Sequence, residues 1–399
     1  MATETRNARG AAAPRGASFS LSDPMFRAAF YQIVVVGAVV LVGWFLISNT
    51  LDNLERRSIA TGFGFLEREA SFGIGESLID YSPRDTYGRA FLVGVLNTLK
   101  VSVIGIVLAT LLGTLIGVAR LSSNWLVAKL ASAYVEIVRN VPPLLQLFFW
   151  YALASDGLPA VRQALNPLPG VYLSQRGLWF PVPSHDPIWQ AMGIAFAVAV
   201  IAVIFLRRWA AARQARTGQP FPTGRIAFLL LLGLPLATWI AGGAPTALDM
   251  PVLAGFNFRG GLVISPEFFA ILIGLTVYTA AFIAEVVRSG ILAVNWGQTE
   301  AARALGLTGG QTLRLVVLPQ ALRVIVPPLT SQYLNLTKNS SLALAIGYPD
   351  VVSILNTTLN QTGQAIEGVT MIMGTYLTIS LSISLFMNWY NKRIALVER

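Results

Sequence analysis

Cysteine is absent from this sequence, and histidine occurs once, as His185. Disulfides, iron–sulfur clusters, thiol chemistry and histidine-rich zinc sites are therefore excluded. Charge is also scarce, since 12% of the residues are Asp, Glu, Lys or Arg while 54% are hydrophobic. Ordinary globular domains carry about twice that share of charged residues. A chain of 399 residues with so few charges cannot cover a water-facing surface, which largely excludes a soluble enzyme.

The apolar residues are gathered into long runs. A helix needs roughly 20 apolar residues to cross a bilayer. Residues 1–27 contain no such run and no apolar core of a signal peptide. Beyond this tail the sequence predicts eight spans, at residues 28–48, 91–119, 131–153, 187–206, 226–242, 262–284, 321–346 and 369–388. The expected fold is all-α, a polytopic membrane protein with about eight transmembrane helices.

The basic residues are distributed unevenly between the loops. If the N-terminus is cytoplasmic, 18 of the 29 lysines and arginines fall on the cytoplasmic side, eight fall outside, and Lys100, Arg139 and Lys338 lie inside spans. The positive-inside rule then favours a cytoplasmic location for both termini. Topology thus explains the net charge of +10, and nucleic-acid binding need not be invoked. Three long loops are expected, two outside and one inside: 49–90, the proline-rich 154–186, and 289–320.

The inner loop has the pattern of two short helices with a break between them. Residues 298–305 form helices readily, Gly306 can adopt the left-handed conformation that ends a helix, and Thr308 can cap the next helix. Small alanines beside a glycine let another protein approach the backbone closely, so a cytoplasmic docking surface is expected. A DNA-binding helix-turn-helix has a similar pattern. The flanking spans, and only two basic residues between 297 and 320, disfavour that alternative.

The same segment resembles the signature loop of ABC importer permeases. That signature reads Glu-Ala-Ala, three residues, glycine, nine residues, an aliphatic residue, one residue and Leu-Pro. The chain matches it without a gap at Glu300, Ala301, Ala302, Gly306, Val316, Leu318 and Pro319. Three further segments resemble the polar amino acid permease branch of this family: residues 134–151, 284–291 and 335–350. The long N-terminal part is similar to the general L-amino-acid permeases of the Aap/Bzt kind.

The resemblance implies the transmembrane domain of a type I ABC importer, whose core has five spans. It covers residues 91–155 and 262–392, so the spans at 28–48, 187–206 and 226–242 would be additions. The implied division is a cytoplasmic tail at 1–27, an extra span with a periplasmic loop at 28–90, and a permease domain at 91–392. That domain would contain an insertion with two extra helices at about 156–261 and a coupling loop at 289–320.

The resemblance also implies a function and a set of partners. The chain would be the permease subunit of an ATP-driven uptake system for polar or general L-amino acids in the bacterial inner membrane. Substrate would move from periplasm to cytoplasm by alternating access. The implied partners are a periplasmic amino-acid-binding protein, a cytoplasmic ABC ATPase dimer and a second, different permease chain. The residues that would transmit movement of the ATPase are Glu300, Ala301, Ala302, Gly306, Leu318 and Pro319.

The lysines independently indicate that the motor is a separate protein. A P-loop requires Gly-Lys followed by Ser or Thr, so that the lysine reaches the phosphates. None of the four lysines follows a glycine: Lys100, Lys129, Lys338 and Lys392. The chain is therefore not expected to be an enzyme or to bind a metal or cofactor, and Mg-ATP would bind to the partner ATPase.

Two Glu-x-x-Arg pairs lie at span positions, Glu136 with Arg139 and Glu285 with Arg288. A spacing of three residues places each pair on one helix face, where the charges can neutralise each other. Both pairs are candidates for a gate or a substrate cavity, and the alternative is an ordinary pair of charges at a helix end. For Glu136 and Arg139 we expect a buried pair within a helix that residues 141–143 interrupt.

The seventh predicted span, residues 321–346, is the most polar. At about 100° per residue, one arc of the helix carries Ser331, Gln332, Asn335, Lys338 and Asn339. This stripe could line a translocation path, with Lys338 meeting an α-carboxylate. The alternatives are interhelical hydrogen bonding and a Lys338 side chain that extends to the interface. The permease motif adds the neighbouring Ser340 to the candidates.

Two other classes of protein compete with this interpretation. An ion-coupled secondary amino acid transporter would need a buried carboxylate relay, and of the candidates Glu136 and Glu285 each has an arginine of its own. A membrane-embedded enzyme would need catalytic groups, which one histidine, no cysteine and few intramembrane acids hardly supply.

Overall fold

The computed structural model describes residues 24–56 and 61–394. Most of the predicted tail, 1–27, lies outside them. The helices are α1 (Pro24–Arg56), α2 (Tyr87–Ala119), α3 (Trp125–Asn140), α4 (Pro143–Ser155), α5 (Pro187–Thr217), α6 (Thr223–Ala241), α7 (Pro266–Leu292), α8 (Trp296–Ala304), α9 (Gly309–Thr312), α10 (Leu318–Asn339), α11 (Val351–Thr362) and α12 (Ala365–Ile394). Shorter turns are η1 (Phe63–Glu67), η2 (Val161–Gln163), the π-helical η3 (Leu313–Val317) and η4 (Ser340–Ile346).

The prediction of a polytopic helical membrane protein is confirmed. Within the described residues, seven helices are long and apolar enough to cross a membrane: α1, α2, α5, α6, α7, α10 with its flanking turns, and α12. The remaining predicted span, 131–153, is not one helix but the pair α3 and α4. The break falls at Val141, which is extended, and at Pro142, in agreement with the predicted interruption. The helical conformation is disfavoured for a residue that precedes proline, and Val141 precedes Pro142, so α3 ends there.

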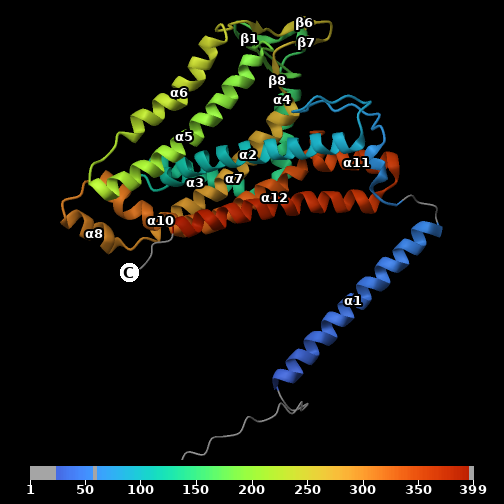
Figure 1. Ribbon diagram of the computed structural model, residues 1–399, viewed down its shortest axis with the longest axis horizontal. Coiled ribbons are helices and arrows are strands. Elements are labelled where there is room, and N and C mark those ends of the chain that lie inside the picture. Colours follow the sequence, from blue (N-terminus) through green and yellow to red (C-terminus); the bar gives the residue numbers. More distant parts are fainter. Residues whose placement is uncertain (1–23, 57–60, 395–399) are drawn as a thin grey trace, which may run out of the picture.

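Helix α7 lies at the centre of the bundle and packs against α2, α3, α4 and α10 (Figure 1). Its contact with α2 is unusually close because glycines of α2 face it. A methyl group at Gly113 would lie 2.7 Å from Cβ of Ile283, and one at Gly117 would lie 2.7 Å from the carbonyl oxygen of Ala284. Helices in lipid associate through such close backbone packing, since apolar side chains gain little by leaving lipid for one another.

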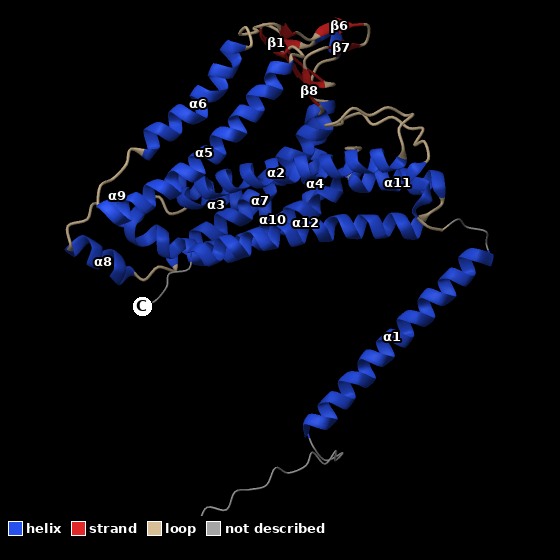
Figure 2. Ribbon diagram, viewed as in Figure 1, coloured by secondary structure: helices blue, strands red, loops and turns tan. Residues whose placement is uncertain are grey.

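The insertion after α4 contains β-strands that the sequence reading did not predict. Helices α5 and α6 form a hairpin, and the strands gather at one end of it (Figure 2). Four strands form an antiparallel sheet in the order β1 (Leu165–Leu168), β2 (Val171–Ser174), β3 (Gly177–Phe180) and β8 (Leu262–Ile264). The other four strands form two separate pairs, β4 (Val182–Pro183) with β5 (Leu248–Asp249) and β6 (Val252–Ala254) with β7 (Asn257–Arg259).

The pairing of β3 with β8 corrects one predicted boundary. Residues 262–264, expected to begin the sixth span, are a strand, and α7 starts at Pro266 instead. Ser265 is extended, and its hydroxyl accepts a hydrogen bond from the amide of Phe268 at 3.0 Å. A serine cap followed by proline at the first helical position is a favoured helix start.

Residues 61–86 cover the end of the bundle opposite α8. Residues 61–86, here called the outer segment, pack Phe65 and Ala70 against Tyr87 and Val93 of α2. Gly62 is held by α12, because its amide donates to Glu367 Oε1 at 2.6 Å. Helix α1 itself stands apart from the other helices (Figure 1).

We expect Gly113→Ala to destabilise the protein, because the added methyl group would overlap Ile283 Cβ and the carbonyl oxygen of Ala280. Overpacking of this kind costs about 1–3 kcal/mol. The matched control is Gly374→Ala in α12, where no atom lies within 4 Å of the added group. Thermal unfolding in detergent, followed by tryptophan fluorescence, measures both variants. Equal midpoints would contradict the proposed tight α2–α7 contact.

Candidate functional site: the coupling loop and the polar groups of the bundle

The predicted coupling loop, residues 289–320, starts inside the last turn of α7, which extends to Leu292, and its first separate element is α8, after a three-residue turn. Asn295 caps α8, its side chain accepting a hydrogen bond from the amide of Gly297 at 2.8 Å. Trp296 Nε1 donates to Glu300 Oε1 at 2.9 Å, which fixes that carboxylate along the helix. Glu300 and Ala301 are exposed, whereas Ala302 is buried at 3%. The outward surface of α8 therefore includes the first two residues of the signature and not the third.

The predicted break and cap of the coupling loop are confirmed. Gly306 has φ +79°, the left-handed conformation, and has open space around it. Thr308 caps α9, with its hydroxyl accepting from the Gln311 amide at 3.4 Å and the Gln311 side chain accepting from the Thr308 amide at 2.9 Å. Leu305, immediately before the break, is 83% exposed.

The second short helix of the loop is not a separate element. The chain runs without a break from α9 through the π-turn η3 into α10. Pro319, expected to mark a join, is the second residue of α10 and directly follows the π-turn η3, where the ordinary helical hydrogen-bond pattern is interrupted. Leu318 and Pro319 are both exposed. The coupling loop is thus continuous with the helix that bears the polar stripe.

Glu285 is the centre of an ion-pair cluster that joins three helices. Its carboxylate accepts from Arg288 Nη2 at 2.6 Å, the pair that the spacing predicted, and also binds Arg120 Nη1. Arg120 follows the last residue of α2, and its Nε contacts Ser132 Oγ of α3 at 3.4 Å. Arg120 was not among the sequence candidates, because nothing in the linear pattern relates it to a carboxylate 165 positions later.

The predicted buried pair of Glu136 and Arg139 is wrong. Both side chains are exposed on α3, and no ion pair joins them among the described residues. The guanidinium of Arg139 instead lies 5.0 Å from the ring centroid of Phe282 on α7. The two charges are therefore exposed at the surface of α3, and Arg139 contacts an aromatic ring of α7 in place of Glu136.

The polar stripe of α10 also lies on an outward face. Ser331, Asn335 and Lys338 are exposed, and Gln332 and Asn339 are half-buried. Lys338 forms no ion pair with a described residue. It lies in the last turn of α10, where the helix dipole stabilises a cation. Ser340 is different: it is buried at 1%, and its hydroxyl donates to the Thr337 carbonyl oxygen at 2.7 Å. Ser340 therefore does not share the outward face of the stripe.

Comparisons with known proteins identify the family. Residues 102–396 match the family described as binding-protein-dependent transport system inner membrane component. The chain belongs to this family. The general L-amino acid transport system permease protein AapQ of Rhizobium johnstonii is 53% identical over 382 residues, 95% of each chain. The putative amino-acid ABC transporter permease protein YhdX of Escherichia coli is 55% identical over 385 residues, 96% of this chain and 98% of that one.

A third relative of similar length extends the comparison. The glutamate/glutamine/aspartate/asparagine transport system permease protein BztB of Rhodobacter capsulatus is 43% identical over 422 residues, 97% of this chain and 99% of that one. The chain is accordingly a permease component of an ABC importer and not an enzyme, since ATP hydrolysis in such systems is done by a separate subunit. The comparisons give no support to an ion-coupled transporter.

We expect Glu285→Gln to lower the stability of the permease, because it leaves the Arg120 and Arg288 guanidinium groups without their shared carboxylate. Hydrogen bonds to charged groups contribute about 1.5–3 kcal/mol each. Glu136→Gln is the matched control, since Glu136 is exposed and has no ion pair among the described residues. Thermal unfolding midpoints in nanodiscs should fall for Glu285→Gln alone. A midpoint that stays at the wild-type value in both variants would remove the cluster from the stabilising contacts.

Proposed function

We propose that this permease moves polar and general L-amino acids from the periplasm to the cytoplasm by alternating access. The observation that carries the proposal is similarity to amino acid permeases over nearly the whole chain. AapQ, YhdX and BztB are named as amino acid transport components, and each alignment includes the insertion that contains α5 and α6. The preferred substrates would therefore be L-amino acids as a class.

The coupling loop is the part of this chain that would receive force from a cytoplasmic ABC ATPase dimer. Helix α8 offers an apolar and hydrogen-bonding surface, with Trp296 at 64% and Leu305 at 83% exposure beside Glu300 and Ala301. Gly306 gives the chain its sharp turn, and Leu318 and Pro319 begin the helix that leads into the bundle. Mg-ATP would bind to the ATPase. Closure of that dimer would then move α7 and α10 together through the loop between them.

The proposed location is the bacterial inner membrane, with both termini in the cytoplasm. The distribution of basic residues supports this orientation. The β-strands and the outer segment lie at the end of the bundle opposite α8 (Figure 1), so they would face the periplasm. The domain division is then a tail at 1–27, a span and periplasmic segment at 28–90, and a permease domain at 91–392, with the insertion at 156–261 and the coupling loop at 289–320.

A second, different permease chain would cover the outward polar faces of α3 and α10. Exposed charges within a hydrophobic span are costly in lipid, and they are normally turned toward protein or a water-filled cavity. We infer that the translocation path runs along the stripe of α10, with Gln332, Asn335, Lys338 and Asn339 as lining candidates. Glu136 and Arg139 would form a gate on the exposed polar face of α3, which the second permease chain would also cover. A periplasmic amino-acid-binding protein would deliver the substrate.

The decisive test is uptake by the complete complex in proteoliposomes. With substrate-loaded binding protein outside, uptake of labelled L-glutamine should require ATP inside and should persist when the proton gradient is collapsed. This follows from the absence of a lysine that could form a P-loop in this chain, since energy must come from the partner ATPase. Uptake that follows an imposed proton gradient and ignores ATP would refute the proposal.

The coupling role predicts a difference between two glycines of the loop. Gly306→Ala places a side chain at φ +79°, which costs about 1–2 kcal/mol and should rotate α8 relative to α9. Gly309→Ala adds the same methyl group three residues later, at an ordinary φ and in equally open space. Uptake and stimulated ATP hydrolysis should fall several-fold for Gly306→Ala only, at equal abundance in the membrane. Identical transport by the two variants would argue against a conformational requirement at Gly306.

A further inference from the structure

The outer segment does not lie on top of the bundle but enters it at Glu76. The backbone carbonyl oxygen of Glu76 accepts from Asn97 Nδ2 of α2 at 2.8 Å, and the same amide group donates to the carbonyl oxygen of Pro349 at 2.9 Å. Asn97 is fully buried. A buried side-chain amide that binds two backbone carbonyls from distant parts of the chain fixes the position of both. Glu76 is therefore held at a defined depth beside α2.

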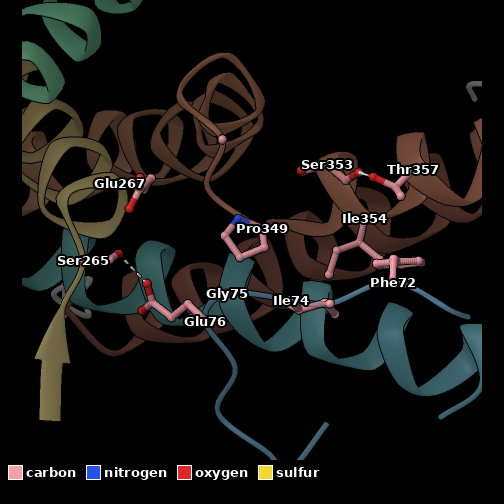
Figure 3. A pocket seen from close by; sticks show the side chains of 12 residues that line it. Phe72, Ile74, Gly75, Glu76, Ser265, Glu267, Pro349, Ser353, Ile354 and Thr357 are labelled. Atoms are coloured by element: carbon pink, nitrogen blue, oxygen red, sulfur yellow. Dashed lines mark hydrogen bonds between the residues drawn. The ribbon is translucent and has the colours of Figure 1, made fainter. Parts of the chain in front are cut away.

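The Glu76 side chain occupies a site built by two other elements. Its Oε1 lies 2.5 Å from Nζ of Lys100 on α2. Its Oε2 accepts a hydrogen bond from the Ser265 hydroxyl at 2.7 Å, which Figure 3 shows as a dashed line. Lys100 Nζ also lies 4.0 Å from the ring centroid of Phe268 on α7. Each oxygen of the Glu76 carboxylate thus has its own donor, an ammonium group on one and a hydroxyl on the other. Together the two donors form a carboxylate-binding site.

The position of Lys100 makes an anionic partner necessary. Lys100 is the only charged residue from Phe91 to Ala119 and lies about 20 Å along α2 from its first residue, at 1.5 Å per residue. Its side chain is 21% exposed and that of Glu76 is 15% exposed. A lone cation at such depth is costly in an apolar span. If the outer segment withdrew, Lys100 would lose its only ion-pair partner among the described residues.

A cavity beside this pair has the groups that the rest of an amino acid would need. It encloses about 330 Å³ and is lined by Glu76 and Ser265 together with Glu267, Ser353 and Thr357. Figure 3 shows these side chains around the cavity. The Glu267 carboxylate, which accepts from the Tyr151 hydroxyl at 3.3 Å, can receive an ammonium group. Ser265 lines this cavity, and Lys100 contacts Glu76 in its wall, so a carboxylate that replaced Glu76 would meet Lys100 and Ser265 while the ammonium group of the same amino acid would meet Glu267.

We propose that Lys100 and Ser265 bind the α-carboxylate of the transported amino acid, and that Glu76 occupies this site as an internal carboxylate when the outer end is closed. The assignment rests on the proposed amino acid transport and adds the position at which this chain first recognises the substrate. Glu76 keeps Lys100 neutralised in the absence of substrate, and the substrate carboxylate replaces Glu76 when the outer segment moves away. One competing interpretation is that the pair only ties the outer segment to α2.

Direct binding of labelled L-glutamine to the purified complex, without binding protein or nucleotide, tests the site. Glu76→Gln removes the internal carboxylate and should bind L-glutamine. Adding Lys100→Gln to that variant should weaken binding about tenfold or more, since a hydrogen bond to a charged group is lost. L-Glutaminamide, which lacks the carboxylate, should bind the two variants with equal affinity. Equal binding of L-glutamine to both variants, or binding to neither, overturns the proposal. Glu67→Gln, an exposed carboxyl of the same segment, is the control and should behave as wild type.

Exchange of the two charges separates a binding site from a structural tie. The double variant Glu76→Lys with Lys100→Glu keeps an ion pair at the same place, so its thermal midpoint should recover from the loss caused by Lys100→Glu alone. Its ATP-driven uptake should remain lost, because the cation has left α2. Recovery of both stability and uptake would show a tie only and overturn the proposal. Wild-type uptake is measured in parallel, so failure of amino acid transport itself is distinguished from failure of this site.

Discussion

The glycine-mediated contact between α2 and α7 is the constraint on which the rest of the bundle depends. Gly113 and Gly117 allow the α2 backbone to approach α7 more closely than any side chain would permit. In lipid, apolar side chains gain little by leaving the bilayer for one another, so shape fit between backbones decides which helices associate. Because α7 also contacts α3, α4 and α10, its position relative to α2 sets the position of all three.

The same central helix connects the two ends of the molecule. At one end α7 begins beside Ser265 and Phe268, which contact Glu76 and Lys100. At the other end α7 carries Glu285 and leads directly into α8. Helix α10 returns from the loop and packs closely on α7, since Ile325 fills the space beside Gly290. If the loop transmits force as proposed, its displacement would act on α7 and α10 as one packed pair rather than on each helix separately.

Local chemistry made much of this architecture predictable from sequence. The spans follow from uninterrupted apolar runs, and the turn of the coupling loop follows from Gly306 and Thr308, whose conformational preferences do not depend on distant contacts. The failures concern pairings across space. Glu285 pairs with Arg120 as well as its neighbour Arg288, and the strand pairing of β3 with β8 joins residues on either side of the α5–α6 hairpin. Helical periodicity placed Glu136 and Arg139 on one face but could not show which way that face turns.

The hydrogen bonds of Gly62 have a consequence for the biogenesis of the protein. Its amide donates to Glu367, and its carbonyl oxygen accepts from the side chain of Gln364, so a residue between the first two spans is bound to the start of the last one. The spans of a nascent chain enter the membrane in sequence order, and Gln364 and Glu367 are synthesised some 300 residues after Gly62. The contacts that hold Gly62 thus form only when nearly the whole chain has been synthesised, whereas the packing of the outer segment on α2 and the Glu76–Lys100 ion pair can form much earlier.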